Sequence, residues 1–534
     1  MVKVLVADKL SDAGIERLRA SSGVEVDVKL GLGEDDLAGT VGDYEGMIVR
    51  SGVKVTPKVL AKPGKLRAVA RAGVGVDNID LPSATAAGVL VLNTPEANTL
   101  STAELTMALM LAMARHIPTG DAHVKAGQWK RSQFVGTQLA GKTLGIVGFG
   151  RVGRAVAQRA LAMEMKVVAY DPFFGADTAM DDKVAITPDL DTLLKQADVL
   201  TIHAAKTPET SNMIDAGKLA LLPDGAMVIN CARGGIINEQ ALAEAIAGGK
   251  LAGAAVDVYS KEPPEGNPLI GVDRVITTPH LGASTEEAQQ AVAFEAIDAL
   301  LGYLLRGEIR NAVNVTGLPA QLSDQDRRVI DLAQRMGLIL APLCGGGINE
   351  LTITTHGAGL EGIAPAAGRY MLAQLLRPYC QENLNVINVE DVARSRGIKI
   401  RRTSDPGSIY FTDVLELTVD ARDGRHLIQG TVFHDHLPHV LCLDGYRMDI
   451  VPEGEMLVSL NDDIPGTIGV YGTVIGEGGI NIADMTHGRK GNMALMFSMV
   501  DQPVPDEVIQ KLLAIDRIHL ARRVSLPPLE RPRM

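Results

Sequence analysis

Three polar residues stand where strands are predicted to end, and their types suit proton transfer on an acidic substrate. Arg233 follows the apolar run VINCA, Glu262 follows AVDVYSK, and His280 follows VITTP. Ligands of open α/β sheets bind beyond the carboxyl ends of the strands, so we expect these side chains to converge. An imidazole exchanges protons near neutral pH, and a neighbouring carboxylate favours the protonated form of the imidazole. A guanidinium can bind the carboxylate of a substrate bidentately. We therefore predict His280, Glu262 and Arg233 as catalytic residues, although each alone is also compatible with a structural role.

A second motif indicates what accepts the electrons. The run TLGIVGFGRVG places Gly148, Gly150 and Gly153 after an apolar strand and at the start of a helix, and Asp171 follows the next strand, KVVAYD. This is the full context of a dinucleotide-binding turn, in which a pyrophosphate lies at a helix N-terminus and the acid binds the ribose hydroxyls. No arginine stands between residues 172 and 177, so the sequence favours NAD over NADP.

Composition excludes several other classes of protein. The chain has 534 residues and a formal net charge of −12, so there is no basic field for nucleic acid. Its longest apolar stretch, 105–114, is far shorter than the roughly 20 residues that span a bilayer, and the N-terminus alternates like a first strand. The four cysteines are widely scattered, which is typical of reduced thiols. We expect a cytoplasmic protein of several domains.

The predicted elements form two α/β lobes. Strands alternate with helices between residues 3 and 93, and the same rhythm returns from residue 144 to residue 280. A capping box of Ser101 and Glu104 is expected to open the helix between the lobes, and a helix over 284–305 should return the chain to the first lobe. The substrate-binding lobe is therefore predicted over 1–97 and 284–315, and the NAD-binding Rossmann lobe over 98–283.

Residues 316–534 lack the regular alternation of strands and helices seen in the two lobes. Residues 316–452 are predicted to form a mixed α+β domain. Residues 453–534 follow the order strand, helix, strand, strand, helix, strand, which is the ferredoxin-like βαββαβ arrangement.

Several longer motifs carry a family resemblance. The segments RAGVGVDNID (71–80), NTPEANTLSTAE (93–104), NCARGGIINE (230–239) and TPHLGASTEEAQ (278–289) resemble the D-isomer-specific 2-hydroxyacid dehydrogenases. IVRSGVKVT (48–56) and GASTEEAQ (282–289) are most similar to the members that oxidise 3-phospho-D-glycerate to 3-phosphohydroxypyruvate, the first step of L-serine synthesis. The whole chain resembles their long form, which ends in an ACT domain.

The resemblance implies roles for individual residues. His280 would be the general acid/base, Glu262 its partner and Arg233 the carboxylate anchor. The implied cofactor-binding residues are Gly148, Gly150, Arg151, Val152, Gly153, Asp171, Cys231, Ala232, Asp257, Gly282 and Ala283, with Asp257 holding the nicotinamide carboxamide. The implied substrate-binding residues are Arg50, Ser51, Gly73, Val74, Gly75, Asn98, Lys130 and Arg131.

A phosphate group on the substrate would need cations. Arg50, at the end of a predicted strand, is the first choice. Lys130 and Arg131 are the second choice, reaching into a neighbouring subunit's cleft, and the alternative is that they belong to a dimer interface without ligand. A homodimer or homotetramer is expected.

The matching effector residues of the C-terminal domain are Asn461, Asp463 and Asn481, which would bind L-serine between two subunits; alternatively, this domain only dimerises. No metal is predicted. His434, His436 and His439 lack completing ligands, and the basic cluster at 394–402 is interpreted as a solvated face rather than an anion site.

Two other functions stay open. One is a dehydrogenase for another D-2-hydroxy acid, because the phosphate-binding cations are inferred. The other is a non-catalytic NAD-sensing protein on the same fold, which would not need the set of Arg233, Glu262 and His280.

Overall fold

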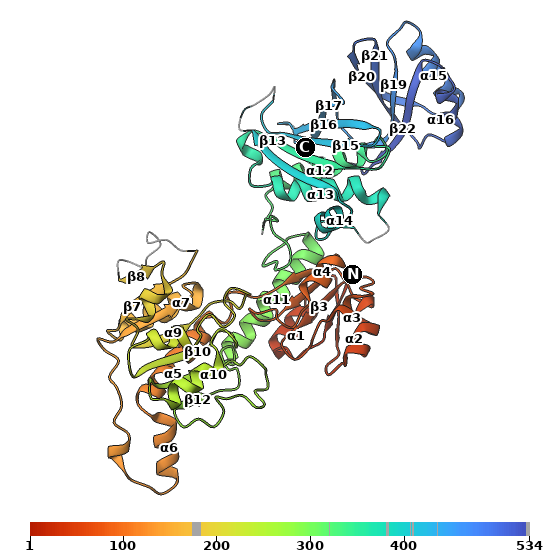
Figure 1. The fold of residues 1–534 in the computed structure, drawn as a ribbon. Coiled ribbons are helices and arrows are strands. Elements are labelled where there is room, and N and C mark those ends of the chain that lie inside the picture. Colours follow the sequence, from red (N-terminus) through yellow and green to blue (C-terminus); the bar gives the residue numbers. More distant parts are fainter. Residues whose placement is uncertain are drawn as a thin grey trace.

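The computed structural model describes residues 1–173, 183–319, 321–380, 384–405, 407, 411–434 and 436–529, and these form four sheets with their helices (Figure 1). We call the corresponding units the first lobe, the second lobe, the intervening unit and the C-terminal unit. Two of the sheets are parallel, one is mixed and one is antiparallel.

The first lobe holds a parallel sheet in the order β2-β1-β3-β4-β5. Its elements are β1 (Val2–Val6), α1 (Asp12–Arg19), β2 (Val24–Val28), α2 (Glu34–Thr40), β3 (Gly46–Val49), α3 (Pro57–Leu60), β4 (Ala68–Arg71), α4 (Leu81–Ala86), β5 (Leu90–Leu92) and α11 (Glu286–Arg306). Helix α11 packs on β3, β4, β5 and α1, so a segment far later in the sequence completes this core. The predicted return of the chain to the first lobe is confirmed by this packing.

The second lobe is a parallel sheet in the order β12-β11-β10-β9-β6-β7-β8. Its elements are α5 (Thr99–Ala114), α6 (Ile117–Lys125), β6 (Thr143–Val147), α7 (Arg151–Ala162), β7 (Lys166–Tyr170), β8 (Val184–Thr187), α8 (Leu190–Leu194), β9 (Val199–Ile202), α9 (Ala216–Leu221), β10 (Ala226–Asn230), α10 (Glu239–Ala247), β11 (Leu251–Val256) and β12 (Val275–Thr277). The central strands are apolar runs because helices cover both faces.

Helix α5 begins three residues earlier than predicted. Asn98 is its N-cap residue, whereas Ser101 lies inside the first turn and its buried hydroxyl has no hydrogen-bond partner within the described chain. The predicted capping box of Ser101 and Glu104 is therefore wrong.

The intervening unit is a mixed sheet in the order β14-β13-β15-β16-β17-β18. Its elements are α12 (Asp324–Leu340), β13 (Glu350–His356), α13 (Ala364–Leu376), α14 (Val389–Ser395), β14 (Lys399–Asp405), β15 (Val414–Ala421), β16 (Gly424–Val432), β17 (Pro438–Leu443) and β18 (Tyr446–Ile450). It contacts the first lobe through Val386 and Ile387, which join that lobe's core, and through Asn385, whose side-chain amide donates to the Gly88 carbonyl at 2.8 Å.

The C-terminal unit is an antiparallel sheet in the order β20-β21-β19-β22. Its elements are β19 (Gly454–Asp462), α15 (Thr467–Glu477), β20 (Ile482–Lys490), β21 (Met493–Val500), α16 (Asp506–Leu513) and β22 (Ile518–Leu526). The chain order and the sheet order together are the predicted ferredoxin-like arrangement. One face packs on α15 and α16, and the other contributes Met456, Phe497 and Val524 to the core of the intervening unit.

Buried Arg335 of α12 reinforces this junction. Its guanidinium donates to the carbonyl oxygens of Pro452 at 2.8 Å and Pro527 at 2.7 Å, which flank the C-terminal sheet. The intervening and C-terminal units are therefore tied by an apolar core and by a buried cation.

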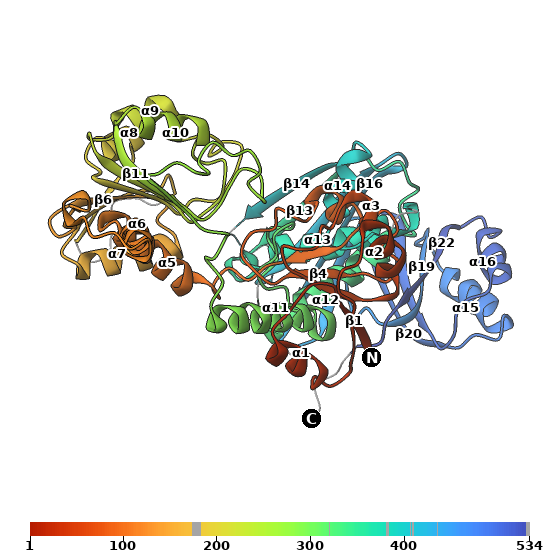
Figure 2. The ribbon, with the colours of Figure 1, turned by 90° about the horizontal axis from the view of Figure 1, so that it is seen from below.

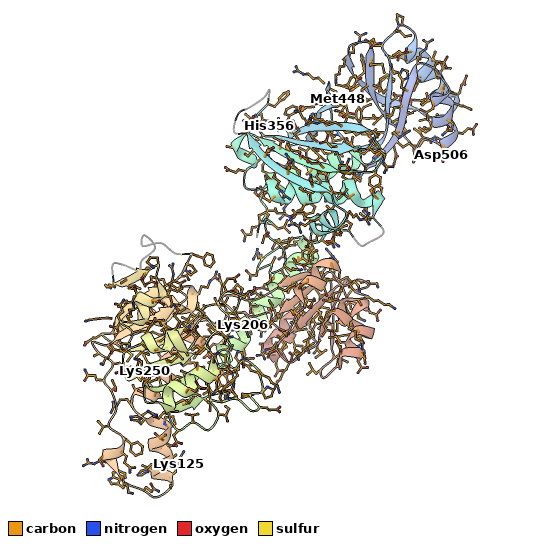
Figure 3. The ribbon with its side chains drawn as sticks, viewed as in Figure 1. Lys125, Lys206, Lys250, His356, Met448 and Asp506 are labelled. Atoms are coloured by element: carbon orange, nitrogen blue, oxygen red, sulfur yellow. The ribbon has the colours of Figure 1, made fainter. Side chains whose placement is uncertain are left out.

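The second lobe stands apart from the other three units (Figures 1 and 2). The chain crosses between the lobes at residues 93–98 and 278–285. Helix α6 projects from the second lobe as an arm, with Lys125 far from both lobes (Figure 3), and it buries none of its residues. Trp129, which follows it, is 78% exposed.

Among the described residues, no helix is long and apolar enough to cross a membrane. The domain boundaries at residues 97, 283, 315 and 452 stay a prediction.

Candidate active site between the two lobes

The glycine-rich turn has the shape that a pyrophosphate requires. Gly148 has φ +93°, and a Cβ there would lie 2.6 Å from the Ala204 nitrogen. A Cβ on Gly153 would collide with the Gly148 carbonyl oxygen, so this glycine lets α7 approach its strand. A Cβ on Gly150, in contrast, would meet no atom within 4 Å. The open space therefore lies in front of Gly150, at the N-terminus of α7, where unpaired N–H groups favour an anion.

Arg151 and Val152 form the first turn of α7. The Arg151 guanidinium is exposed and pairs with Glu96 at 2.7 Å, whereas Val152 packs against the core of the second lobe. Of the two side chains, only Arg151 is placed to face a ligand.

Asp171 is buried at the end of β7, beside the glycine turn. Its carboxylate accepts hydrogen bonds from the backbone N–H groups of Phe149 at 2.9 Å and Phe173 at 3.0 Å. These bonds fix the carboxylate and leave it lone pairs for ribose hydroxyls. Residues 174–177, which follow it in the sequence argument for NAD, lie outside the described residues.

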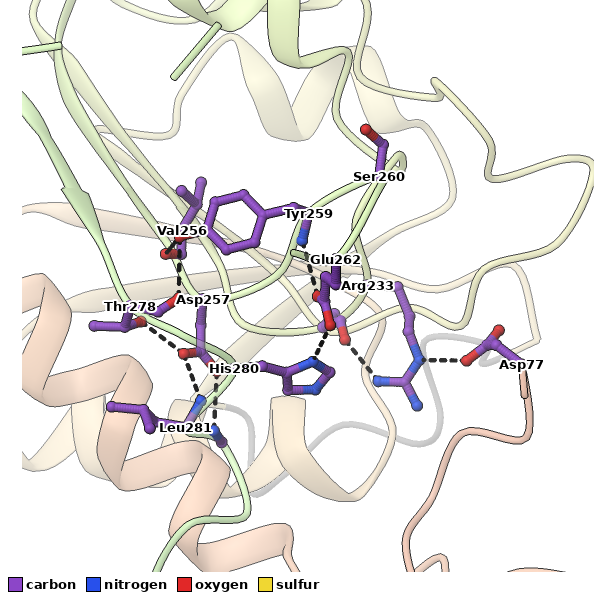
Figure 4. Close-up of polar contacts among 12 residues, drawn as sticks. Asp77, Arg233, Val256, Asp257, Tyr259, Ser260, Glu262, Thr278, His280 and Leu281 are labelled. Carbon is purple, nitrogen blue, oxygen red and sulfur yellow. Dashed lines mark hydrogen bonds and ion pairs between the residues drawn. The ribbon is translucent and has the colours of Figure 1, made fainter. Parts of the chain in front are cut away.

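His280 and Glu262 meet as the sequence predicts (Figure 4). The Nδ1 atom of His280 lies 2.8 Å from Glu262 Oε2, and Glu262 Oε1 accepts from the Tyr259 N–H at 3.1 Å. Burial raises the pKa of the Glu262 carboxyl, but His280, the Tyr259 N–H and the charge of Arg233 together outweigh burial, so the net pKa lies below its usual value. An ionised Glu262 thus holds the imidazole by Nδ1 and directs Nε2 away from itself.

The backbone of His280 is held in an uncommon conformation. Its φ is +56°, in the left-handed region, where non-glycine residues are rare and often functional. Completely buried Asp257 holds this loop on both sides of the histidine: it accepts from Thr278 Oγ1 at 2.6 Å, Leu281 N at 2.7 Å and Gly282 N at 2.9 Å (Figure 4). Asp257 was expected to hold the nicotinamide carboxamide, and its observed contacts are those of a residue that positions the His280 loop.

The ends of this loop are also anchored. Thr102 Oγ1 donates to the Gly282 carbonyl at 3.0 Å, and the Gln289 side-chain amide donates to the Ala283 carbonyl at 2.6 Å. Gly282 and Ala283 therefore lie where the second lobe passes into α11.

Arg233 lies at the junction of the two lobes. Its Nε is 3.3 Å from Asp77 of the first lobe, and a Cβ on Gly75 would collide with its guanidinium. Asn230 shapes the turn that carries it, accepting from Ala232 N at 3.1 Å and donating to the Arg233 carbonyl at 2.9 Å.

Cys231 precedes this turn. Burial raises the pKa of its thiol to about 12, so the thiol is uncharged at neutral pH and contributes shape rather than reactivity.

The first lobe contributes a cation that the sequence analysis missed. Arg71 ends β4 beside Arg50, which follows β3, and its buried Nε has no hydrogen-bond partner among the described residues. Burial, followed by the charges of Arg233 and Arg50, lowers the Arg71 pKa to about 10. A Cβ on Gly73 would occupy the space of the Arg71 guanidinium. Three arginines from both lobes thus influence one another, and Asp77 and Asp8 offset their repulsion only in part, because the Arg71 pKa stays lowered.

The other predicted substrate residues fall into two groups. Ser51, Val74 and Asn98 lie on the segments around Arg50, Gly73 and the first crossing, and the buried Asn98 Oδ1 has no partner within the described residues. Lys130 and Arg131 follow α6. This helix projects away from the first lobe, which carries Arg50 and Arg71 (Figure 1).

The predicted effector residues are also separated within one chain. Asn461, at the end of β19, pairs with Ala494 of β21, whereas Asn481 precedes Ile482, which pairs with Val500. The span from residue 494 to residue 500 is about 20 Å of strand. Asp463 is paired with Arg489 at 2.7 Å, and the Asn481 side-chain amide donates to Asp501 at 2.8 Å.

In the intervening unit, the basic cluster at 394–402 and the histidines at 434–439 do not form an anion or metal site among the described residues. Arg394, Arg401 and Arg402 pair with Asp391, Glu350 and Glu390, as on a solvated face. His436 contacts Arg328 and His439 contacts Asp449, and no group of three potential metal ligands occurs in the described part of the chain.

Known proteins share both the fold and the sequence. Residues 107–282 match the model of the NAD-binding domain of D-isomer-specific 2-hydroxyacid dehydrogenases, and residues 327–443 match that of the D-3-phosphoglycerate dehydrogenase intervening domain. The TT0316 protein of Thermus thermophilus has a similar structure, with a TM-score of 0.53, 36% identity and coverage of 58% of this chain and 99% of its own. An NAD complex of formate dehydrogenase from Staphylococcus aureus aligns with a TM-score of 0.52 and 28% identity, covering 59% of this chain and 99% of its own.

The two lobes and the site between them are those of an NAD-dependent oxidoreductase of the D-isomer-specific 2-hydroxyacid dehydrogenase class, as predicted. The D-3-phosphoglycerate dehydrogenase of Archaeoglobus fulgidus is 40% identical over 98% of this chain and 100% of its own, and that of Bacillus subtilis is 34% identical over 99% and 100%. The chain belongs to the D-3-phosphoglycerate dehydrogenase family.

Proposed function

We propose that this chain oxidises 3-phospho-D-glycerate to 3-phosphohydroxypyruvate with NAD, as the first step of L-serine synthesis. The observation that carries the proposal is the pairing of His280 with Glu262 at 2.8 Å, in the second lobe that also presents Arg233 toward Arg50 and Arg71. One acid/base group and three cations suit a small hydroxy acid with two anionic ends.

Each side chain has a defined task. Arg233 binds the substrate carboxylate and polarises the adjacent carbon–oxygen bond. His280 Nε2 accepts the hydroxyl proton during oxidation and returns it during reduction, while Glu262 stabilises the imidazolium that forms. NAD held at the Gly148–Gly153 turn supplies the hydride acceptor. The open space at Gly150 and the fixed Asp171 carboxylate fit that cofactor.

The phosphate distinguishes this substrate from other D-2-hydroxy acids. We assign it to Arg71 and Arg50, because the half-buried Arg71, whose Nε has no partner among the described residues, gains most from a dianion. Lys130 and Arg131 of a second subunit are proposed as outer contacts, with the exposed arm as part of a homodimer or homotetramer interface. We also propose the four-domain division predicted from sequence, and the cytoplasm as the site of action.

The test is NADH oxidation with 3-phosphohydroxypyruvate compared with unphosphorylated hydroxypyruvate. We expect kcat/KM for the phosphorylated substrate to be at least about 100-fold higher, since two hydrogen bonds from charged groups, worth about 1.5–3 kcal/mol each, contribute about 3 kcal/mol or more. Similar values for both would indicate a different D-2-hydroxy acid. The absence of turnover with both, together with tight NADH binding, would indicate an NAD-sensing protein.

We further propose L-serine as an effector, bound between two C-terminal units by Asn461 and Asp463 of one and Asn481 of the other. Their separation within one chain supports a site shared by two subunits. Serine is expected to lower the initial rate, and Asn481→Ala should remove this inhibition while keeping the uninhibited rate. Gln502→Ala serves as the control, because Gln502 is exposed on the neighbouring loop after β21 and donates to the Gly479 carbonyl, two residues before Asn481. A rate that serine leaves unchanged would mean that the unit only mediates assembly.

A further inference from the structure

One ion pair joins the crossing segment to the cofactor turn. Glu96 lies between β5 and α5, and its Oε1 is 2.7 Å from Nη2 of Arg151, the first residue of α7. The same helix start is where the open space at Gly150 invites a pyrophosphate. A bound dinucleotide therefore places a second anion beside a cation that Glu96 already engages.

The crossing segment is anchored by Glu295 and does not depend on Glu96 for its position. Half-buried Glu295 of α11 accepts from the Ala97 N–H at 3.1 Å and from the Asn311 side-chain amide at 2.9 Å. Glu96 itself is exposed, with 67% of its side chain accessible. An exposed ion pair contributes about 0–1 kcal/mol, so its loss leaves the fold intact.

We propose that Glu96 is a positioning residue that speeds the release of reduced cofactor. It competes with the pyrophosphate for Arg151 and repels it, so the dinucleotide is held less tightly than the turn alone would hold it. Product release limits the turnover of many enzymes with closing lobes, which makes such a weakening useful. The inference rests on the NAD part of the proposed function and not on the identity of the substrate.

A matched control is a second exposed ion pair that also involves α7. Glu104 of α5 pairs with Arg159 of α7 at 3.4 Å and is similarly exposed, but this pair lies two turns further along α7, away from the glycine turn. A general effect of surface charge would appear in both variants, whereas competition for Arg151 would appear in one.

The experiment measures NADH binding to the full chain without substrate. The dissociation constant is obtained by fluorescence titration and the dissociation rate by stopped flow. For Glu96→Gln we expect both to fall about two- to fivefold, which corresponds to the upper range of an exposed pair. The change should shrink at about 1 M salt, where the Debye length is about 3 Å. Glu104→Gln should leave both values unchanged.

The double variant Glu96→Gln/Arg151→Gln completes a thermodynamic cycle. In the Arg151→Gln background, the second substitution should change NADH binding by much less than it does alone. NADH binding that is unchanged or weaker in Glu96→Gln, or an equal effect in both backgrounds, would overturn the proposal. Because no substrate is used, these outcomes are separate from a failure of the assay with 3-phosphohydroxypyruvate.

Discussion

Replacing His280 by asparagine is expected to lower kcat about a thousandfold while the dissociation constant for NADH changes by less than about threefold. General acid/base catalysis contributes about 10²–10⁴-fold, and no other imidazole is paired with Glu262 among the described contacts. Asparagine is preferred to alanine because residue 280 has φ +56°, a region that asparagine tolerates better. Steady-state rates and NADH titration of the same preparation test the expectation.

A matched substitution of Glu262 separates orientation from charge. Glu262→Gln keeps a hydrogen-bonding group near Nδ1 but removes the negative charge that stabilises the imidazolium, so we expect a smaller loss of kcat than in His280→Asn. If His280→Asn retained turnover within about tenfold of the original, the acid/base role would be wrong. If it lost NADH binding, the histidine would instead belong to the cofactor site.

Replacing Arg71 by methionine is expected to lower kcat/KM for the phosphorylated substrate about 100-fold and to raise the thermal midpoint of the unliganded protein. The first effect follows from losing charged hydrogen bonds to the phosphate. The second follows from the lowered Arg71 pKa: a folded-state pKa of about 10, below the usual 12.5, means that keeping this group charged at neutral pH opposes folding. Methionine removes the buried charge and retains most of the volume.

The prediction requires that kcat/KM falls and the thermal midpoint rises in the same variant, Arg71→Met. Arg71→Lys keeps the charge but not the bidentate geometry, so its kcat/KM should lie between that of the unsubstituted protein and that of Arg71→Met. Turnover of unphosphorylated hydroxypyruvate should change little in Arg71→Met. Equal losses with both substrates would place Arg71 at the carboxylate, and a fall in the thermal midpoint would show that its role is structural.

The sequence predicts the second lobe well because its signals are local. The glycine turn, Asp171 and the strand ends that carry Arg233, Glu262 and His280 are all set by short segments with strong patterns. Arg71 was missed although it ends a predicted strand, because its significance lies in burial without a partner beside Arg50 and Arg233. The buried Nε, unpaired within the described residues, and the nearby charges of Arg50 and Arg233 depend on three distant segments that only the folded lobes bring together.

The structure differs from the sequence prediction at Asp257 and at the start of α5 as well, and in both places contacts between distant segments are the reason. Nothing in the run around Asp257 indicates that its carboxylate accepts three hydrogen bonds from residues 278–282. The start of α5 was misplaced because a capping-box pattern at Ser101 is a local preference, whereas the contact of this helix with α7 and the lobe crossing decides where it begins.

Because the intervening and C-terminal units share a core, we expect them to move as one rigid body. Parting them would expose buried side chains such as Met456 and Phe497, each worth about 1.5–3 kcal/mol, and would remove the Pro452 and Pro527 carbonyls from the Arg335 guanidinium. A displacement of the C-terminal sheet should therefore also displace the intervening unit, whose Asn385–Gly88 contact lies just before β5 and the crossing that bears Glu96. Although they are far apart along the chain, the C-terminal sheet and the crossing between the lobes are thus connected through two packed junctions.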